Sequence, residues 1–425
     1  MTVFHALPRC PAPMVFAVFI IPTNFVFIRE HYLPWMIPPR FILIIILVTS
    51  ILILALPRAP YIAVAPMRLW APVLGLGALM LLSLAYTPAL EEGFGRTVEF
   101  WTSTILAYFA AVLIFAEPGS LRYFLGTLVG MASVLGLFLL MIEPFSEAYE
   151  FTTPLGSNYL AIQHLAGMAI LTVLYHFLLR ARRVASRLLW LGVLTLLLWL
   201  MVYVGGKGPV ASLLLTLLVI SATAIRINAR RGSLVFHKRI VGHTLSAALI
   251  GGLVLTLVVA RTGFSPLLLR FGFLLTWGHY SQVERVENAK VAMELFRQHP
   301  LLGAGIGAFS EYAVEVPGVE ERFRYPHNIL LEALAELGSF GFCMLSTILL
   351  SAFARTRNLM QTHRASLFPR VALSLLVFTF LNSLTSQNLS NPALFGFVGM
   401  AHAVRKPLPG SRNAQAWGRD SGQRR

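Results

Sequence analysis

Apolar runs long enough to cross a lipid bilayer recur along most of this chain. A transmembrane helix needs roughly 17 to 25 predominantly apolar residues. A mean hydropathy of +0.73 with 57% hydrophobic residues also lies outside the range of soluble globular proteins. The sequence therefore predicts an all-α, polytopic transmembrane helical bundle of about twelve spans. The expected spans lie near residues 12–28, 40–57, 68–86, 97–116, 121–142, 160–179, 188–204, 208–225, 240–260, 327–353, 370–386 and 389–404.

The basic residues predict how this bundle is oriented. The net charge of +16 does not indicate a nucleic-acid partner, because Arg and Lys gather in the short segments 180–187, 226–239 and 355–370 and in the tail. Cytoplasmic loops carry an excess of Lys and Arg. We therefore expect both termini in the cytoplasm and the long hydrophilic loop, about 261–326, in the periplasm. The expected organisation is one membrane domain over 1–404, with a disordered basic cytoplasmic tail over 405–425 and no cleaved signal peptide.

The composition argues against metal chemistry. The single aspartate is Asp420, in the tail, and the two cysteines, Cys10 and Cys343, are far apart. Neither an Asp-x-Asp site nor a Cys/His zinc spacing is available. We therefore expect no metal and no cofactor.

A polar stretch opens the tenth expected span, where a lipid-facing helix should carry no ionisable group. It runs from Arg324 to Gly338 and includes His327, Asn328, Glu332 and Glu336. Such groups are costly at membrane depth and usually face a cavity or a site. Pro326 is expected to place His327 in the first turn of the helix, on the same face as the two glutamates. The sequence predicts a polar site where the long loop meets this span.

Two other segments are expected on the same face of the membrane. Asn158 lies at the end of segment 143–159, and Lys207 stands between two glycines in the turn from span seven to span eight. The glycines would bring the backbone close to an anion while Lys207 supplies charge. The alternative for Lys207 is a membrane anchor that extends its amine to the interface.

The long loop itself is expected to contain a helix over Ser281–His299. An apolar stripe of Val286, Ala289, Met293 and Phe296 has helical spacing, with Arg285 beside it. Arg285 either contributes charge to the site or pairs with a neighbour such as Glu284. The glycines at 303, 305 and 307 are expected to form a tight turn rather than a nucleotide-binding loop, because no strand precedes them.

These residues carry a resemblance. Pro326-His-Asn-Ile-Leu-Leu-Glu-Ala-Leu-Ala-Glu-Leu-Gly-Ser-Phe-Gly341 resembles the His-Asn and Glu-x-Gly hallmark of the bacterial O-antigen ligase and O-antigen polymerase superfamily. Arg285 with His299-Pro-Leu-Leu-Gly-Ala-Gly-Ile-Gly-Ala-Phe309 is similar to a second motif of that family. Gly206-Lys-Gly-Pro-Val-Ala-Ser-Leu-Leu214 is similar to a third, and Leu155-Gly-Ser-Asn-Tyr-Leu-Ala161 is a looser match. The resemblance covers about 155–345. Many members have Arg where this chain has Lys207, so a bidentate phosphate clamp is not expected there.

The resemblance implies a metal-independent, inverting glycosyltransferase of the inner membrane with a periplasmic active site. The donor would be a glycan on undecaprenyl diphosphate, and the acceptor a hydroxyl of the lipid A core in lipopolysaccharide biosynthesis. In that mechanism His327 is the general base, while Lys207, Arg285 and Arg324 stabilise the diphosphate. Asn158, Asn328, Glu332 and Glu336 would bind substrate or orient His327.

Three alternatives stay open at this point. An O-antigen or exopolysaccharide polymerase would use a second carrier-linked glycan as acceptor, and a protein-glycosylating relative would use a protein. A membrane transporter would also have many spans and buried polar residues, but transporters usually show internal repeats with broken helices, and no such repeat is visible in the sequence.

Overall fold

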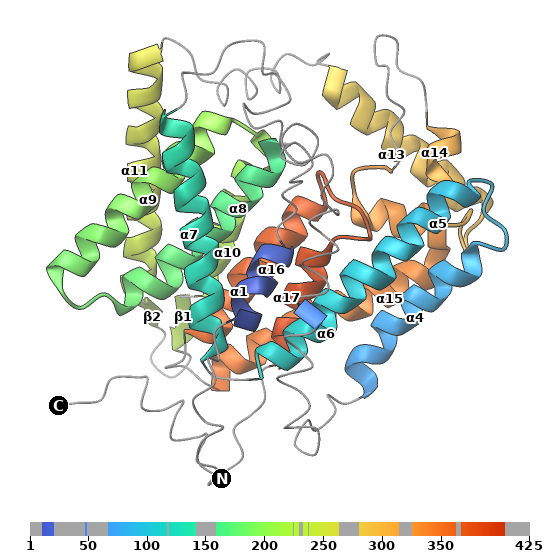
Figure 1. Cartoon of the computed structure of the whole chain (residues 1–425), viewed down its shortest axis with the longest axis horizontal. Helices are drawn as coiled ribbons and strands as arrows, with labels where there is room; N and C mark the ends of the chain where they lie inside the picture. Colours follow the sequence, from blue (N-terminus) through green and yellow to red (C-terminus); the bar gives the residue numbers. More distant parts are fainter. Residues whose placement is uncertain are drawn as a thin grey trace, which may run out of the picture.

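The chain is a bundle of helices (Figure 1). The computed structural model describes residues 11–20, 47–48, 67–116, 119–141, 159–223, 225–228, 233–236, 238–262, 280–313, 325–362 and 367–403. The elements are α1 (Pro11–Ile20), α4 (Met67–Ser83), α5 (Leu90–Glu99), the π-helical η3 (Phe100–Thr104), α6 (Ile105–Ile114), α7 (Ser120–Met141), α8 (Tyr159–Thr172), the π-helical η4 (Val173–Leu178), α9 (Val184–Val204), α10 (Lys207–Thr223), β1 (Ile225–Asn228), β2 (Ser233–Phe236), α11 (Lys238–Thr262), α13 (Tyr280–Gln298), α14 (Phe309–Tyr312), α15 (Ile329–Thr362), α16 (Phe368–Ser383) and α17 (Pro392–Ala403).

The helices confirm a polytopic, all-α membrane protein. Six of those described are long and apolar enough to cross a bilayer, namely Leu90–Ile114, Ser120–Met141, Leu160–Leu178, Val184–Val204, Val241–Ala260 and Ile329–Gln361. Leu69–Ser83, Lys207–Thr223, Phe368–Ser383 and Pro392–Ala403 are shorter apolar helices. A helix therefore lies in each expected span from 68–86 onward, and α1 occupies part of the first. The second expected span, 40–57, lies almost wholly outside the described residues, so the total of about twelve stays a prediction.

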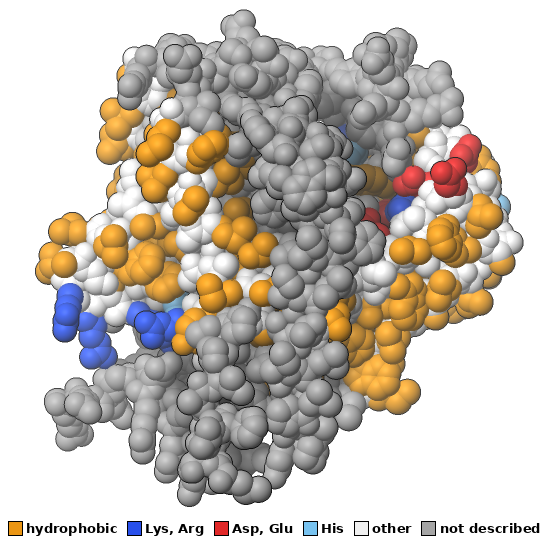
Figure 2. All heavy atoms as spheres, viewed as in Figure 1, with side chains coloured by type: hydrophobic (Ala, Val, Ile, Leu, Met, Phe, Trp, Pro, Cys, Tyr) orange, Lys and Arg blue, Asp and Glu red, His pale blue; other side chains and the backbone are white. Residues whose placement is uncertain are grey.

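The side of the bundle has the chemistry of a lipid-facing surface. On α11, Leu245, Leu249, Leu253 and Leu257 recur every four residues and are each more than half exposed. Residues four apart lie on one face of a helix, so this stripe would be unfavourable in water and suits hydrocarbon. Figure 2 shows hydrophobic side chains over the flanks, with acidic groups at the end near α5 and basic groups at the opposite end.

The centre of the bundle is formed by α16 and α17, which the other helices surround (Figure 1). Every residue of α17 is buried, and the helix packs against α6, α15 and α16. A buried polar chain joins three of these elements. The Tyr108 hydroxyl lies 2.9 Å from His402 Nδ1, and Ser351 Oγ lies 3.0 Å from His402 Nε2. Polar side chains that bond across helices hold membrane bundles together.

Two local features differ from the sequence prediction. The basic segment 226–239, expected as a plain loop, contains an antiparallel pair in which Ile225 faces Phe236. β1 (Ile-Arg-Ile-Asn) alternates apolar and polar residues, and β2 (Ser-Leu-Val-Phe) is mainly β-favouring apolar residues, which suits strand pairing. In addition, the fourth expected span, 97–116, begins earlier than predicted, and Glu91 and Glu92 lie in its first turn. The helix begins at Leu90, so a charged first turn extends the span outward.

Candidate functional site

The polar stretch at the start of α15 is built around a break in that helix. Gly338 has φ 63° and ψ −161°, which is not helical. Only glycine adopts such a conformation at low cost. A side chain would also meet the Leu301 carbonyl oxygen, because a Cβ at Gly338 would lie 2.3 Å from it. The break divides α15 into a short outer segment, which carries both glutamates, and a long inner segment.

A helix break leaves backbone groups without partners, and the loop between α13 and α14 supplies them. Ala304 N–H donates to the Ala335 carbonyl at 2.9 Å, and Gly305 N–H donates to the Glu336 carbonyl at 3.0 Å. In the other direction, Ser339 N–H donates to the Pro300 carbonyl at 2.9 Å. Irregular backbone is tolerated at membrane depth only where it is satisfied in this way. The expected tight turn is thus confirmed, with positive φ at Gly303, Gly305 and Gly307, and it is fixed directly onto the site.

Arg96 of α5 is the charged partner of both glutamates. Its Nη1 donates to Glu336 Oε1 at 2.8 Å, and its Nη2 pairs with Glu332 Oε1. The arginine side chain is 5% exposed and both carboxylates are fully buried. A buried charge is costly unless it is paired and hydrogen-bonded. Two carboxylates and one guanidinium make this cluster a fixed, buried ionic centre.

The carboxylates also hold two connecting segments by their backbones. Glu336 Oε1 accepts a hydrogen bond from Phe309 N–H at 3.3 Å, at the start of α14. Glu332 Oε2 accepts one from Leu389 N–H at 2.9 Å, in the segment 384–391 that joins α16 to α17. In that segment Ser390 Oγ also donates to the Arg96 carbonyl at 3.1 Å. The ionic cluster therefore ties α5, α15, the glycine turn and the α16–α17 segment together.

His327 lies just before α15 rather than in its first turn, which corrects the sequence prediction. Asn328 precedes the helix, and its Oδ1 accepts hydrogen bonds from Leu330 N–H at 3.0 Å and Leu331 N–H at 3.2 Å. Asn328 is therefore the N-cap. His327 has φ 54°, the one positive φ of a non-glycine residue in the described chain. Strained backbone of this kind is held by its surroundings and is frequent at functional sites.

The environment of His327 keeps its imidazole neutral. Burial, and secondarily the positive charge of Arg285, lower the pKa of His327 from 6.5 to about 4. The ring stacks at a tilt on Tyr325, with 4.6 Å between ring centroids. Burial also raises the pKa of the Tyr325 hydroxyl, while Arg96 acts against that rise. The imidazole is neutral because burial and the positive charge of Arg285 disfavour its protonated form. A neutral imidazole can accept a proton from a substrate.

Lys207 is connected to the Arg96–Glu332–Glu336 cluster through the packing of its neighbour Gly208 on the α16–α17 segment. It begins α10 after Gly205, which ends α9 with φ 76°. The adjoining Gly208 packs so closely on the α16–α17 segment that a Cβ there would lie 3.1 Å from Thr385 Oγ1. Because Leu389 of that segment is bonded to Glu332, one short stretch separates Lys207 from the ionic cluster.

The helix expected over Ser281–His299 is present as α13, but its buried face is not the one predicted. Val286 and Met293 are 50% and 37% exposed. The buried residues are instead Asn288, Ala292 and Leu295. Ala292 and Leu295 join Ala304, Ala308, Phe309 and Ala335 in a buried cluster. The face of α13 that packs against α15 is therefore the one with Asn288, Ala292 and Leu295. Arg285 is exposed on α13.

Two further sequence candidates, Asn158 and Arg324, lie outside the described residues. Conversely, sequence reasoning missed Arg96, Tyr325 and the α16–α17 segment. Arg96 has a recognisable signal, since it is a lone arginine in the outer turns of an apolar span and such a charge needs a partner.

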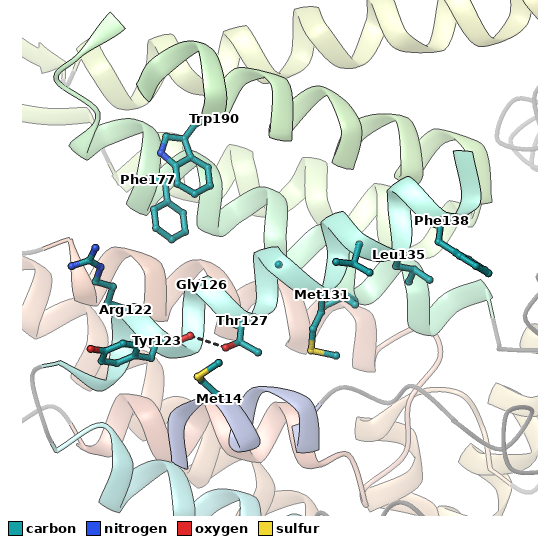
Figure 3. A pocket seen from close by; sticks show the side chains of 13 residues that line it. Met14, Arg122, Tyr123, Gly126, Thr127, Met131, Leu135, Phe138, Phe177 and Trp190 are labelled. Carbon is teal, nitrogen blue, oxygen red and sulfur yellow. Dashed lines mark hydrogen bonds between the residues drawn. The ribbon is translucent and has the colours of Figure 1, made fainter. Parts of the chain in front are cut away.

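A cavity lies away from this cluster. It is a groove of about 840 Å³ lined by side chains of α1, α7, α8, η4 and α9. Figure 3 shows Met131, Leu135 and Phe138 along α7, with Phe177 stacked on Trp190 near Arg122 at the other end. The groove is almost wholly apolar and has none of the candidate catalytic residues, so its chemistry suits a hydrocarbon chain.

Comparison with known proteins gives one family match. Residues 159–346 match the family model described as O-Antigen ligase. The match includes Lys207, Arg285, His327 and both glutamates, whereas Arg96 and the α16–α17 segment lie outside it. No curated protein matches the chain.

Proposed function

We propose that this multi-pass membrane protein, whose residues 159–346 match the O-Antigen ligase family model, transfers a glycan from a polyprenyl diphosphate to an acceptor hydroxyl. The acceptor in this proposal is the lipid A core, and the reaction takes place on the periplasmic face of the bacterial inner membrane. The observation that carries the proposal is His327. Burial and Arg285 keep its imidazole neutral, its backbone has a positive φ, and it directly precedes the helix segment that carries the buried glutamates.

The reaction needs a base and a cationic surface. The acceptor hydroxyl loses its proton to the neutral imidazole of His327 as the oxygen attacks the anomeric carbon. The bond from that carbon to the diphosphate breaks, so the configuration is inverted. The charge that develops on the diphosphate is stabilised by Lys207 and Arg285, and Arg324 is the third candidate cation from the sequence. No step requires a metal ion.

Glu332 and Glu336 have a supporting role in this proposal. Their carboxylates are fully buried and bonded to Arg96 and to two backbone N–H groups. They therefore fix the positions of the surrounding segments rather than touch the substrate. Asn328 likewise caps α15, which sets the backbone that carries His327.

The test is a transfer assay with the purified protein in proteoliposomes. The donor is a glycan on undecaprenyl diphosphate, and the two acceptors are lipid A core and a second carrier-linked glycan. Transfer to lipid A core, unchanged by excess chelator, is the expected result. Product only on the carrier-linked glycan would replace the ligase assignment with a polymerase, and absence of any product would overturn the proposal.

A further inference from the structure

The segment that joins α16 to α17 carries two amide side chains that the fold itself does not use. Gln387 and Asn388 are partly exposed, and within the described part of the chain neither side chain makes a hydrogen bond. Their neighbours are all engaged. Thr385 N–H and Ser386 N–H donate to the Asn382 carbonyl, each at 3.0 Å.

The far side of the segment is equally fixed. Leu389 N–H donates to Glu332, and Ser390 Oγ donates to the Arg96 carbonyl. Asn391 Nδ2 donates to Ser383 Oγ at 3.1 Å, and its Oδ1 caps α17 by accepting from Ala393 N–H at 3.0 Å. Gln387 and Asn388 therefore stand on a rigid support, and binding through them would require little ordering of the segment.

The chemistry of these side chains indicates a sugar. An amide group both donates and accepts hydrogen bonds, which matches the neighbouring hydroxyls of a glycan. The carboxylates that could otherwise bind hydroxyls here, Glu332 and Glu336, are fully buried. The α16–α17 segment instead presents two uncharged amide groups together.

The position of Gln387 and Asn388 near Lys207 indicates which sugar of the donor glycan they would bind. Thr385, two residues before Gln387, packs against the Lys207–Gly208 turn, and Lys207 is a proposed cation for the diphosphate. A sugar bonded directly to that diphosphate must lie beside Lys207. Resting on the proposed function, we infer that Gln387 and Asn388 form the subsite for the donor sugar that is attached to the diphosphate.

Binding of two lipids to the protein in nanodiscs tests this subsite independently of transfer. The probes are a short-chain polyprenyl diphosphate and the same lipid carrying one hexose or one N-acetylhexosamine. We expect the wild type to bind the better glycosylated probe about tenfold more tightly than the bare diphosphate. The double variant Gln387→Ala/Asn388→Ala should lose this difference and keep its affinity for the bare diphosphate.

Gln361→Ala is the matched control, since this exposed amide lies at the opposite end of α15, and it should behave as wild type. A double variant that keeps the full preference, or a wild type without one, would overturn the subsite while leaving the proposed function intact. Variants that raise the KM of the acceptor and not of the donor would also overturn it. Failure of the wild type to bind even the bare diphosphate would overturn the proposed function, and the subsite with it.

Discussion

At the residue scale, the proposal depends on a histidine whose neutral form is favoured by its surroundings. A general base must be unprotonated at the working pH. Because burial and Arg285 both disfavour the imidazolium, the pKa of His327 falls to about 4. The neutral form is then fully populated from neutral pH down to well below 6.5, and it is lost as the pH falls through about 4.

This sets the expected pH profile. The acid limb of kcat/KM for transfer should lie near pH 4 rather than near 6.5. Arg285→Gln removes the smaller of the two causes, so its acid limb should move upward, toward but not reaching 6.5. The measurement is the pH dependence of initial transfer rates for both proteins. An acid limb at the ordinary histidine value in the wild type would contradict the role given to the His327 imidazole.

The second residue-scale prediction separates a substrate cation from a membrane anchor at Lys207. If Lys207 stabilises the diphosphate, Lys207→Gln should lose most transfer activity, whereas Lys207→Arg should retain much of it because the charge is kept. At Arg285, by contrast, keeping the charge is not enough. Arg285→Lys should be impaired, because the single ammonium of Lys cannot replace the planar, bidentate guanidinium. Steady-state rates with saturating acceptor measure this. Wild-type rates in Lys207→Gln would assign Lys207 to anchoring alone.

At the scale of elements, the site is held together by the ion pairs that Arg96 of α5 forms with Glu332 and Glu336 in the outer segment of α15. The sequence predicted a polar network at Glu332 and Glu336, because two carboxylates in an apolar span need partners. It could not identify the partner, since Arg96 is 240 residues from Glu336 and only the packing of α5 against the glycine turn brings them together. In the same way, the sequence predicted α13 as a helix but chose the wrong face, because tertiary contacts with α15 and the glycine turn decide which side packs.

These ion pairs predict how substitutions at Arg96, Glu332 and Glu336 change the stability of the folded protein. Arg96→Met leaves two buried carboxylates without a counter-charge and should destabilise the protein by about 3 to 5 kcal/mol. Adding Glu332→Gln and Glu336→Gln in the same chain should recover part of this loss, because no unpaired charge then remains. Thermal unfolding in lipid is the measurement, with Arg122→Met on the far groove as control. A triple variant no more stable than Arg96→Met would show that charge balance is not what the cluster provides.

At the scale of the whole molecule, the acidic and basic ends define an orientation. Arg180, Arg182, Arg183 and Arg187 are exposed at the turn between α8 and α9, and Glu91 is exposed on α5. Figure 2 shows acidic groups at one end of the molecule and basic groups at the other. The α8–α9 turn would face the cytoplasm by the positive-inside rule. The helical class and most span positions followed from hydropathy alone. The site required tertiary structure, because a helix break, an N-cap and a buried ion pair leave little trace in composition.

The orientation predicts where two loops lie. A reporter fused after Gly232 should be active only in the cytoplasm, and one fused after Gly263 only in the periplasm, because a basic segment flanks the first position and the long loop begins at the second. An alkaline phosphatase and a fluorescent protein fusion at each site provide the paired readout. Identical results at the two positions would rule out a periplasmic site on the 261–326 loop.

The most direct test of the account is the transfer rate of His327→Ala in the reconstituted system, with the exposed His299→Ala as matched control and thermal unfolding to verify that both variants are folded. We predict that transfer falls about 10²- to 10⁴-fold in His327→Ala and stays near wild type in His299→Ala. A folded His327→Ala protein that transfers glycan at the wild-type rate would contradict the assignment of His327 as the catalytic base.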